Sequence, residues 1–407
     1  MRTSVKTTYI TVLFIVYLFL SAPGFLLLGN TLSHGHRFKR FVEDKLTGVV
    51  IRQDSPALSL KHFVDGSFQK DFAKWFQEHF GLREALIRFN NQIYFSLFAK
   101  SYQYDGTILI GKGRQLYEKP YVDDFTNVQP PIAMASHRKM VAKLREVQDL
   151  FAKRGIQFIV FITPSKAFSC PEGIPDVLIR RKSGMTTYEA VMPLMADAGI
   201  NLVDGQRIVL DQKKKNGQYP IFPPGGTHWT YLSAYFATAD LMTEIEQLSG
   251  KDLPTLSVAN ITVKERMHHV DRDLAELLNL AQDPPLYVAY DTTFEVQPST
   301  FKPSLRVSLI GGSFAFHPWM IFRNKNMFKS LNYYNYYVLG LTTYPSDPSL
   351  EKNFLPQSRD WWEHEMLKSN VVILEINQIK FYGSHVDVFL DDALQYLKPP
   401  IRQAAIR

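Results

Sequence analysis

The stretch "IQFIVFITPSK", from Ile156 to Lys166, joins an unbroken apolar run to a polar ending. Every residue from Phe158 to Ile162 is apolar, so the run lacks the alternation of a strand with one wet face. Such a run predicts a strand buried on both faces, as in parallel sheets. The ending "TPSK" then falls at the carboxyl end of the strand, where open α/β sheets bind their ligands.

The same logic extends through the second part of the chain, where helical and buried-strand patterns alternate. We predict helices in "SHRKMVAKLREVQDLFAKRG" (136–155) and "TTYEAVMPLMADAG" (186–199), and strands in "INLVDG" (200–205), "RVSLIGGSF" (306–314) and "NVVILEINQ" (370–378). This order is typical of a three-layer α/β/α domain with a mainly parallel sheet. We assign it to residues 101–400, where "YQYDGTILIGKGRQLYEKPYVDDF" (102–125) first predicts a β-hairpin.

The N-terminus predicts a membrane anchor. "TYITVLFIVYLFLSAPGFLLLG" (8–29) carries no charge, and its length matches the ~20 residues that cross a bilayer. Pro23 follows a small-residue site and disfavours cleavage, so we assign 1–29 to an uncleaved transmembrane helix, with cleavage as the alternative. Positive charges before the span place the body outside the cytoplasm, on the periplasmic face of the inner membrane.

Residues 30–100 are predicted to form a helical, membrane-proximal region. Within "SFQKDFAKWFQEHFGLREALIRFNNQIYFSLF" (67–98), aromatic residues recur at helical spacing. For such a stripe, packing into a core is the ordinary interpretation.

Composition excludes several classes. A net charge of +7 is too diffuse to indicate a nucleic-acid partner, and no nucleic-acid-binding motif occurs. Cys170 is the single cysteine, so there is no internal disulfide and no paired-cysteine metal site. The pairs His34/His36 and His268/His269 lack a ligand set, so we expect neither a metal site nor a cofactor.

Two loops carry residues suited to nucleophilic catalysis. Ser313 follows Gly311 and Gly312 at the end of a buried strand, where a sharp turn exposes a hydroxyl. His228 lies in "GGTHWT", where a loop enters a helix, and is the best-placed base for that serine. A capping histidine and a turn serine are the alternatives.

The chain resembles the SGNH-like acetyltransferases of the AlgX/AlgJ type, which O-acetylate exported polysaccharides such as alginate. The resemblance covers about residues 40–395, through "GTILIGKGRQLYEKPYVDDF", "TPSKAFSCPEGIP", "GGTHWT", "DLAELLNL" and "GGSF". It implies an SGNH-like fold, an acetyl-serine intermediate on Ser313, and His228 as base. It also implies a polysaccharide substrate and an acetyl donor passed on by a membrane acyltransferase partner.

Further roles follow from the expected position of these loops. Backbone N–H groups of Gly312 and Ser313 would hold the oxyanion. Lys166 would meet an anionic sugar or acyl group, and Trp229 would serve as a sugar platform, with core packing as an equal alternative for the tryptophan.

One position departs from the family. Its aspartate, two residues before the histidine, is Gly226 here. The site is therefore a Ser-His dyad, or another carboxylate such as Asp204 or Glu375 orients the imidazole, or the protein is an inactive polysaccharide-binding scaffold; an acetyl esterase would use the same residues. If no other group orients His228, Gly226→Asp should raise the rate.

Overall fold

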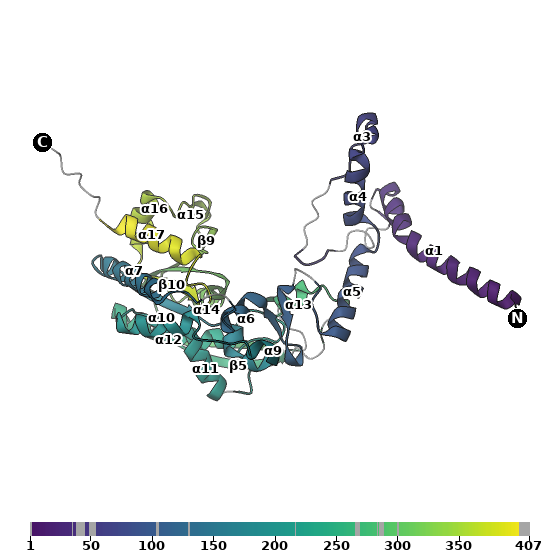
Figure 1. Cartoon of the computed structure of the whole chain (residues 1–407). Coiled ribbons are helices and arrows are strands. Elements are labelled where there is room, and N and C mark those ends of the chain that lie inside the picture. Colours follow the sequence, from purple (N-terminus) through teal and green to yellow (C-terminus); the bar gives the residue numbers. More distant parts are fainter. Residues whose placement is uncertain are drawn as a thin grey trace. The chain divides into compact units, whose positions relative to one another are not determined.

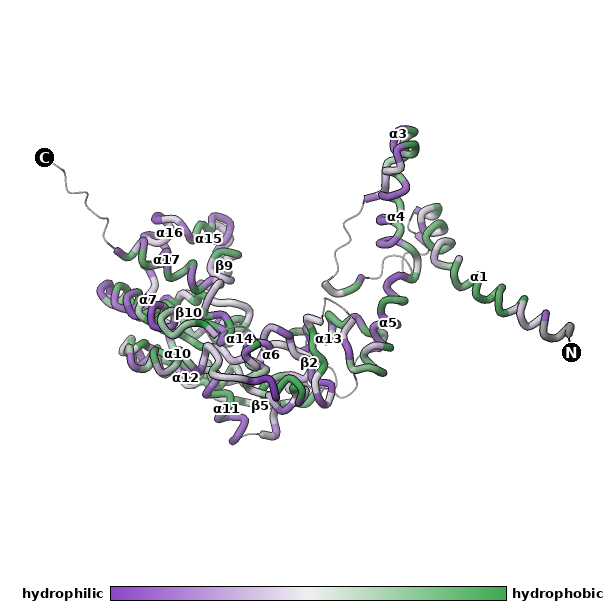
Figure 2. The backbone as a smooth tube through the Cα atoms, in the orientation of Figure 1, coloured by the Kyte–Doolittle hydropathy of each residue, from purple (hydrophilic) through white to green (hydrophobic). Residues whose placement is uncertain are grey.

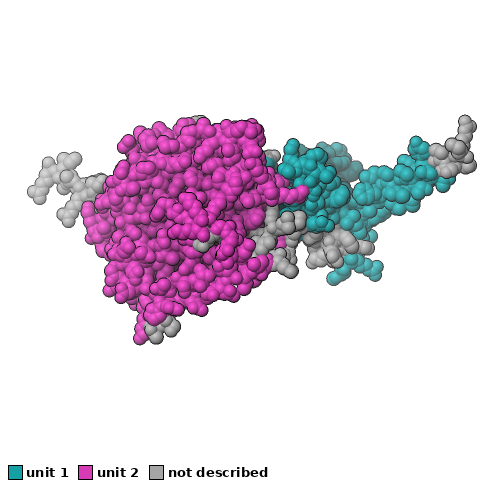
Figure 3. All heavy atoms as spheres, turned by 90° about the horizontal axis from the view of Figure 1, so that it is seen from below, with its two compact units in different colours: residues 1–108, 275–285 teal, residues 109–274, 286–407 magenta. Residues whose placement is uncertain are grey.

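A computed structural model describes residues 2–34, 36–37, 45–48, 54–102, 106–128, 131–215, 217–264, 269–282, 284, 289–298 and 301–398. The chain divides into two compact units, coloured separately in Figure 3. Unit 1 combines residues 1–108 with 275–285, and unit 2 combines 109–274 with 286–407. A segment from the middle of the chain thus belongs to the N-terminal unit.

Unit 1 is helical. It contains α1 (Arg2–Leu32), α3 (Leu60–Val64), α4 (Ser67–His79) and α5 (Arg83–Phe98) (Figure 1). Within α1, residues Lys6–Leu32 are long and apolar enough to cross a membrane, judged by length and composition. Figure 2 shows the apolar stretch along this helix. The Gly81 N–H donates to the Pro23 carbonyl at 3.1 Å, which ties the turn between α4 and α5 to α1.

The aromatic stripe of α4 differs from its prediction. None of the residues of α4 is buried, and the Phe72 side chain is 43% exposed. Aromatic rings instead stack on one another along one side of the helix. The α4 part of the stripe is therefore not buried in a core, contrary to the core-packing interpretation.

The main sheet of unit 2 has six strands in the order β4-β3-β10-β7-β8-β9. All neighbours are parallel except β8 and β9, which are antiparallel. The strands are β3 (Gln157–Thr163), β4 (Leu202–Asp204), β7 (Arg306–Gly311), β8 (Ser330–Asn335), β9 (Gly340–Tyr344) and β10 (Val371–Asn377).

Helices cover both faces of this sheet. On one face, Phe161 and Ile373 join a core with α11, α12 and α14; on the other, Val160 and Leu374 join a core with α7, α10 and α17. Successive residues of each buried strand enter opposite cores, which explains the unbroken apolar runs. The described α-helices from residue 119 onward, whether or not they pack on the sheet, are α6 (Lys119–Phe125), α7 (Met134–Ala152), α8 (Lys166–Ser169), α9 (Asp176–Ile179), α10 (Thr187–Asp197), α11 (Gly205–Lys215), α12 (Tyr231–Ser249), α13 (Asp273–Leu277), α14 (Phe316–Asn324), α15 (Pro348–Lys352), α16 (Arg359–His364) and α17 (His385–Leu397).

Two small antiparallel pairs complete unit 2. Strands β1 (Ile108–Ile110) and β2 (Leu116–Glu118) form the first half of the predicted hairpin, whose remainder is helix α6. Strands β5 (Thr255–Lys264) and β6 (Ala289–Gln297) form a long hairpin that we did not predict. The three-layer α/β/α class with a mainly parallel sheet is confirmed.

Candidate active site

Ser313 lies where β7 leaves the sheet. The strand ends at Gly311, and a short 3₁₀ turn over Ser313–Ala315 leads into α14. A Cβ on Gly311 would lie 2.6 Å from the Ala315 Cβ, and a Cβ on Gly312 would lie 2.8 Å from the Tyr336 ring. The two glycines therefore permit a close turn that leaves Ser313 exposed at the carboxyl edge of the sheet.

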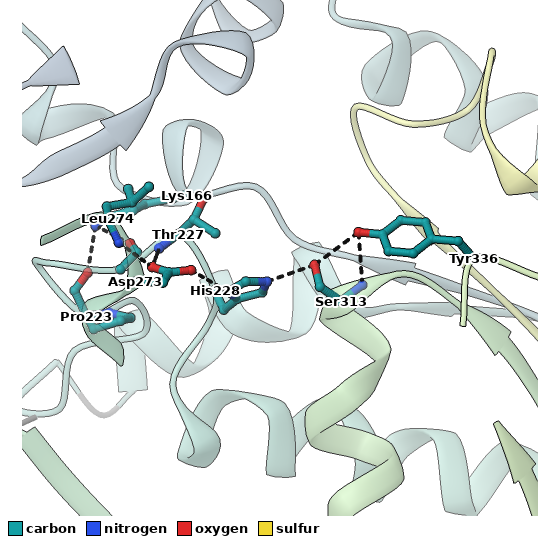
Figure 4. A network of polar contacts seen from close by, with 9 residues as sticks. Lys166, Pro223, Thr227, His228, Asp273, Leu274, Ser313 and Tyr336 are labelled. Carbon is teal, nitrogen blue, oxygen red and sulfur yellow. Dashed lines mark hydrogen bonds and ion pairs between the residues drawn. The ribbon is translucent and has the colours of Figure 1, made fainter. Parts of the chain in front are cut away.

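His228 reaches that serine from the loop before α12. Its Nε2 lies 2.8 Å from Ser313 Oγ (Figure 4). The Thr230 side chain caps α12 by accepting the Ser233 N–H, and the Thr230 N–H donates to the Ile221 carbonyl. These bonds close the loop and hold the imidazole in place, so the structure brings together the two residues that the sequence singled out.

Asp273 is the third member of the cluster, and our sequence reasoning missed it. Its Oδ2 lies 2.9 Å from His228 Nδ1, while Oδ1 accepts the N–H groups of Thr227 at 2.9 Å and Leu274 at 2.8 Å (Figure 4). A carboxylate can only accept, so Nδ1 carries the proton and Nε2 is left to accept from Ser313. Asp273 begins "DLAELLNL", a segment that already carried the family resemblance and held the signal.

The geometry at Gly226 explains why the carboxylate comes from elsewhere. A Cβ at this position would lie 2.7 Å from the Asp271 carbonyl oxygen and 2.9 Å from the Pro223 ring. The segment that carries Asp273 thus occupies the space that a side chain at 226 would need. The alternative orienters Asp204 and Glu375 do not contact His228.

Those two carboxylates have other partners. Asp204 accepts from the Tyr188 hydroxyl at 2.9 Å and the Arg207 N–H at 3.0 Å. Glu375 is fully buried, accepts from the Thr163 hydroxyl, and accepts the Gly312 N–H at 2.8 Å. Burial raises the pKa of Glu375.

The bond to Glu375 corrects the expected oxyanion site. Because the Gly312 N–H donates to a buried carboxylate, it does not face a reacting carbonyl. The Ser313 N–H donates to the hydroxyl oxygen of Tyr336 at 3.3 Å, and that hydroxyl donates to Ser313 Oγ at 3.4 Å (Figure 4). Ser313 N–H and Tyr336 hydroxyl are therefore the polar groups beside the nucleophile.

Tyr336 is held in an unusual backbone conformation. Its φ is +45°, which is uncommon for a residue with a side chain. The Tyr336 N–H donates to the Gly311 carbonyl at 2.8 Å, and its ring meets the His385 ring edge-on with centroids 5.7 Å apart. Such strain concentrates at functional sites.

Lys166 does not face solvent, contrary to its predicted role in substrate binding. It is 2% exposed, and its Nζ donates to the carbonyls of Pro223, Pro224 and Gly226 at 2.6, 3.1 and 2.8 Å. Burial lowers its pKa to about 7. A sugar or acyl group cannot reach an ammonium that is enclosed by the protein.

Trp229 is likewise a core residue. It has no exposed surface, and its ring packs 6.1 Å from the Phe161 ring and 6.4 Å from the Phe314 ring. The platform interpretation is wrong, and the alternative of core packing is correct. Because Trp229 directly follows His228, its burial fixes the loop that carries the histidine.

A further carboxyl group lies within electrostatic range of the site. Burial, then the charge of Asp273, raises the pKa of Glu118, whereas the charges of His228 and Lys380 lower it. The Glu118 side chain makes no hydrogen bond or ion pair with the described residues. Within the described ranges no group of three metal-ligating side chains occurs; His268 lies outside them.

Comparisons with known proteins agree with this architecture. The family model "SGNH hydrolase-like domain, acetyltransferase AlgX" matches residues 121–325, which include His228, Asp273 and Ser313. A search of the curated proteins found no match.

The search of the solved structures found matches that include three bacterial proteins. The O-acetyltransferase domain of Pseudomonas putida AlgJ has a TM-score of 0.44 and 16% identity, covering 67% of this chain and 91% of its own. Pseudomonas aeruginosa AlgX has a TM-score of 0.44 and 14% identity, covering 75% and 71%. Bacillus cereus PatB1 has a TM-score of 0.42 and 11% identity, covering 69% and 98%.

Proposed function

The chain belongs to the AlgX family of SGNH hydrolase-like acetyltransferases, and on this premise we propose that it transfers an acetyl group through Ser313 to a hydroxyl of an exported polysaccharide. The observation that carries the proposal is the continuous line of bonds from Asp273 through His228 to Ser313. In this arrangement Asp273 would be the orienting carboxylate, His228 the base and Ser313 the nucleophile.

In the first half-reaction, Ser313 Oγ attacks the carbonyl carbon of an acetyl ester while His228 Nε2 takes its proton. Asp273 stabilises the imidazolium and fixes its tautomer. The imidazolium then protonates the departing alcohol, which leaves acetyl-Ser313.

The second half-reaction reverses these roles. A sugar hydroxyl gives its proton to His228 Nε2 as its oxygen attacks the acetyl carbon. Collapse of the tetrahedral intermediate returns the proton to Ser313 Oγ and releases the acetylated sugar. In both halves, the Tyr336 hydroxyl and the Ser313 N–H would exchange their bonds within the free site for bonds to the oxyanion.

An acceptor cavity lies along the same edge of the sheet. Its volume is about 640 Å³, and its lining mixes apolar side chains with hydroxyl and carboxyl groups: Pro120, Asp124, Ile132, Met134, Ala190 and Tyr382. The starts of α7 and α10 and the loop after β10 surround it, all at the carboxyl ends of the strands.

A single substitution separates acceptor binding from acylation. Ala190→Trp should fill this cavity and raise KM for the acceptor, leaving acetyl-Ser313 formation unchanged. Ala142→Trp is the matched control, because Ala142 lies on α7 in a different cavity of similar size, about 630 Å³. Equal transfer by the two variants would argue against this acceptor cavity.

The apolar first helix supports a proposal for the location of the protein, and the family for the supply of the donor. We propose that α1 stays in the inner membrane with unit 2 in the periplasm, where a membrane acyltransferase partner supplies the acetyl group. The scaffold alternative drew its support from the missing aspartate at 226, and Asp273 removes that reason. Water in place of the sugar would make the same site an esterase.

The direct test is intact-mass analysis after incubation with p-nitrophenyl acetate. We expect an adduct of one acetyl group on the wild type and none on Ser313→Ala. A polysaccharide hydroxyl should then remove the adduct faster than water does. An adduct that persists on Ser313→Ala would overturn the assignment of the nucleophile.

A further inference from the structure

The aromatic stripe of α4 is an apolar surface that the described residues of unit 1 leave partly uncovered, with Phe68, Trp75 and Phe76 half-buried. Phe63 and Val64, just before α4, are 52% and 78% exposed, and Phe72 is 43% exposed. No residue of α3 or α4 is buried. We call this surface the aromatic face; its members are Phe63, Phe68, Phe72, Trp75 and Phe76.

The rings of the aromatic face form an ordered ladder. Ring centroids are 6.2 Å apart for Phe63–Phe68, 5.9 Å for Phe68–Phe72 and 5.8 Å for Phe72–Trp75. Residues at this helical spacing project from one side of the helix. The result is a continuous aromatic surface rather than scattered exposed side chains, which single monomers rarely leave without a partner.

The polar side of α4 is electrically balanced. Lys70 and Lys74 are matched by Asp71 and Glu78 within the same helix. Attraction to anionic partners therefore contributes little, and burial of the rings is the available source of binding free energy.

The turn that follows α4, at the C-terminal end of the aromatic face, contacts the apolar helix α1. The Gly81 N–H donates to the Pro23 carbonyl at 3.1 Å, and a Cβ on Gly81 would lie 2.6 Å from the Leu26 Cβ. Both Pro23 and Leu26 belong to the segment Lys6–Leu32 that can cross a membrane. The end of α4 is thus fixed against the later part of that segment.

We propose that the aromatic face lies in the lipid–water interface on the side of the membrane that holds unit 2. The inference rests on the proposed membrane position of α1. Tryptophan and other aromatic rings favour the headgroup region, where an apolar body and a polar edge are both satisfied. Because α4 carries no net charge, zwitterionic lipid is a sufficient partner.

The chain contains its own probe for this surface. It has five tryptophans, and Trp75 is the one on the aromatic face; Trp229, Trp319, Trp361 and Trp362 are buried in unit 2 and α1 has none. The full chain is reconstituted in phosphatidylcholine vesicles with or without lipids brominated near the headgroup. We expect bromine to quench part of the emission in the wild type and none in Trp75→Phe.

Variants on the two sides of α4 sharpen the test. Phe72→Ser should reduce the quenching at least twofold, whereas Gln77→Ser, on the opposite side of the helix, should leave it unchanged. Flotation with the vesicles reports on α1 separately, so failure of the anchor and failure of the aromatic face are distinguishable.

Flotation without quenching would overturn the proposal, and so would quenching that Phe72→Ser and Gln77→Ser reduce equally. Loss of quenching with appearance of a cross-linked dimer would assign the face to a second copy.

A second inference concerns Lys166 and rests on its hydrogen bonds to the loop before His228. Its three acceptors, the carbonyls of Pro223, Pro224 and Gly226, form the loop that runs directly into His228. Its Nζ is enclosed; burial lowers the pKa of Lys166, and the charges of Cys170 and Asp273 act in the opposite direction. Lys166 therefore hydrogen-bonds the loop that carries His228 and also interacts electrostatically with Asp273.

We infer that Lys166 is a positioning residue for His228. Removing its three bonds releases the loop, and a displacement of the base by about 1 Å costs on the order of 10²-fold in rate. Lys166→Met should lower the rate of acetyl-Ser313 formation by about that factor while KM for p-nitrophenyl acetate stays constant. Lys213→Met is the control, because Lys213 also binds a carbonyl, that of Ser169, but lies at the surface.

Chemical rescue distinguishes positioning from general stability. Methylammonium should restore part of the rate of Lys166→Ala by filling the vacated site, and should not affect Lys213→Ala. A Lys166→Met variant with full activity would overturn the inference. So would a folded Lys166→Ala variant whose lost activity methylammonium does not restore.

Discussion

The two partners of His228 come from unlike parts of unit 2. Ser313 follows β7, a strand hydrogen-bonded on both sides within the main sheet, and its turn is held by Glu375 from the neighbouring β10. Asp273 lies in the connection between β5 and β6, a hairpin that is not part of that sheet. The proposed nucleophile is therefore positioned by the central core, and the proposed orienting carboxylate by an accessory hairpin. An essential geometry can thus depend on an element that contributes nothing to the main sheet.

The largest effect is expected on the sheet side of this comparison. Ser313→Ala should lower acetyl transfer by about 10⁴-fold or more, because the nucleophilic oxygen is removed. Circular dichroism and thermal unfolding should be unchanged, since the Ser313 side chain is exposed. Undiminished transfer by this variant would contradict its role as nucleophile.

On the hairpin side, Asp273→Asn should lower the rate by about 10³–10⁴-fold. The neutral amide does not stabilise an imidazolium as the carboxylate does, and an NH2 group that faces Nδ1 favours the wrong tautomer of His228. Asp204→Asn is the matched control and should retain near-normal kcat, because Asp204 bonds Tyr188 and Arg207 rather than His228. Equal losses in the two variants would mean that Asp273 has no special role.

Tyr336→Phe should lower kcat by about 10²-fold, the usual cost of removing one oxyanion donor. KM for the acetyl donor should change little if the hydroxyl acts mainly in the transition state. A variant that binds the donor poorly but turns over normally would place Tyr336 in substrate binding instead.

Gly226→Asp tests the contact between the histidine loop and the segment that carries Asp273. We expect the rate to fall about tenfold, with a loss of about 1–3 kcal/mol in the free energy of unfolding, because the new Cβ collides with the Asp271 carbonyl. Gly340→Asp is the control, since a Cβ there meets no atom within 4 Å. A rate increase in Gly226→Asp would show that the carboxylate of Asp273 is not sufficient.

The smallest expected effect is on the pH dependence of stability. The pKa of Lys166 is lowered by burial to about 7 from an ordinary value of 10.5. Between these values the unfolded chain binds the extra proton, so the stability of the wild type should rise with pH in this window relative to Lys166→Met. Urea unfolding across that range checks the sign. A flat difference would mean that Lys166 keeps its proton in the folded protein.

The sequence by itself determined the features that depend on neighbours along the chain. Unbroken apolar runs identified β3, β7 and β10, and the glycine pairs marked the turns before Ser313 and His228. The sequence did not predict the antiparallel β8–β9 pair or the β5–β6 hairpin. β5 is largely exposed, and β8 and β9 lack a simple apolar run.

Only the tertiary structure decided which groups meet across long separations. Asp273 is 45 residues from His228, and Glu375 is 63 residues from the Gly312 N–H that it holds. Lys166, Trp229 and the α4 stripe show the same limit for burial, because a pattern of residue types does not state which surface another element covers. Local patterns follow from backbone geometry and side-chain spacing, whereas partners and burial depend on how the folded elements close around one another.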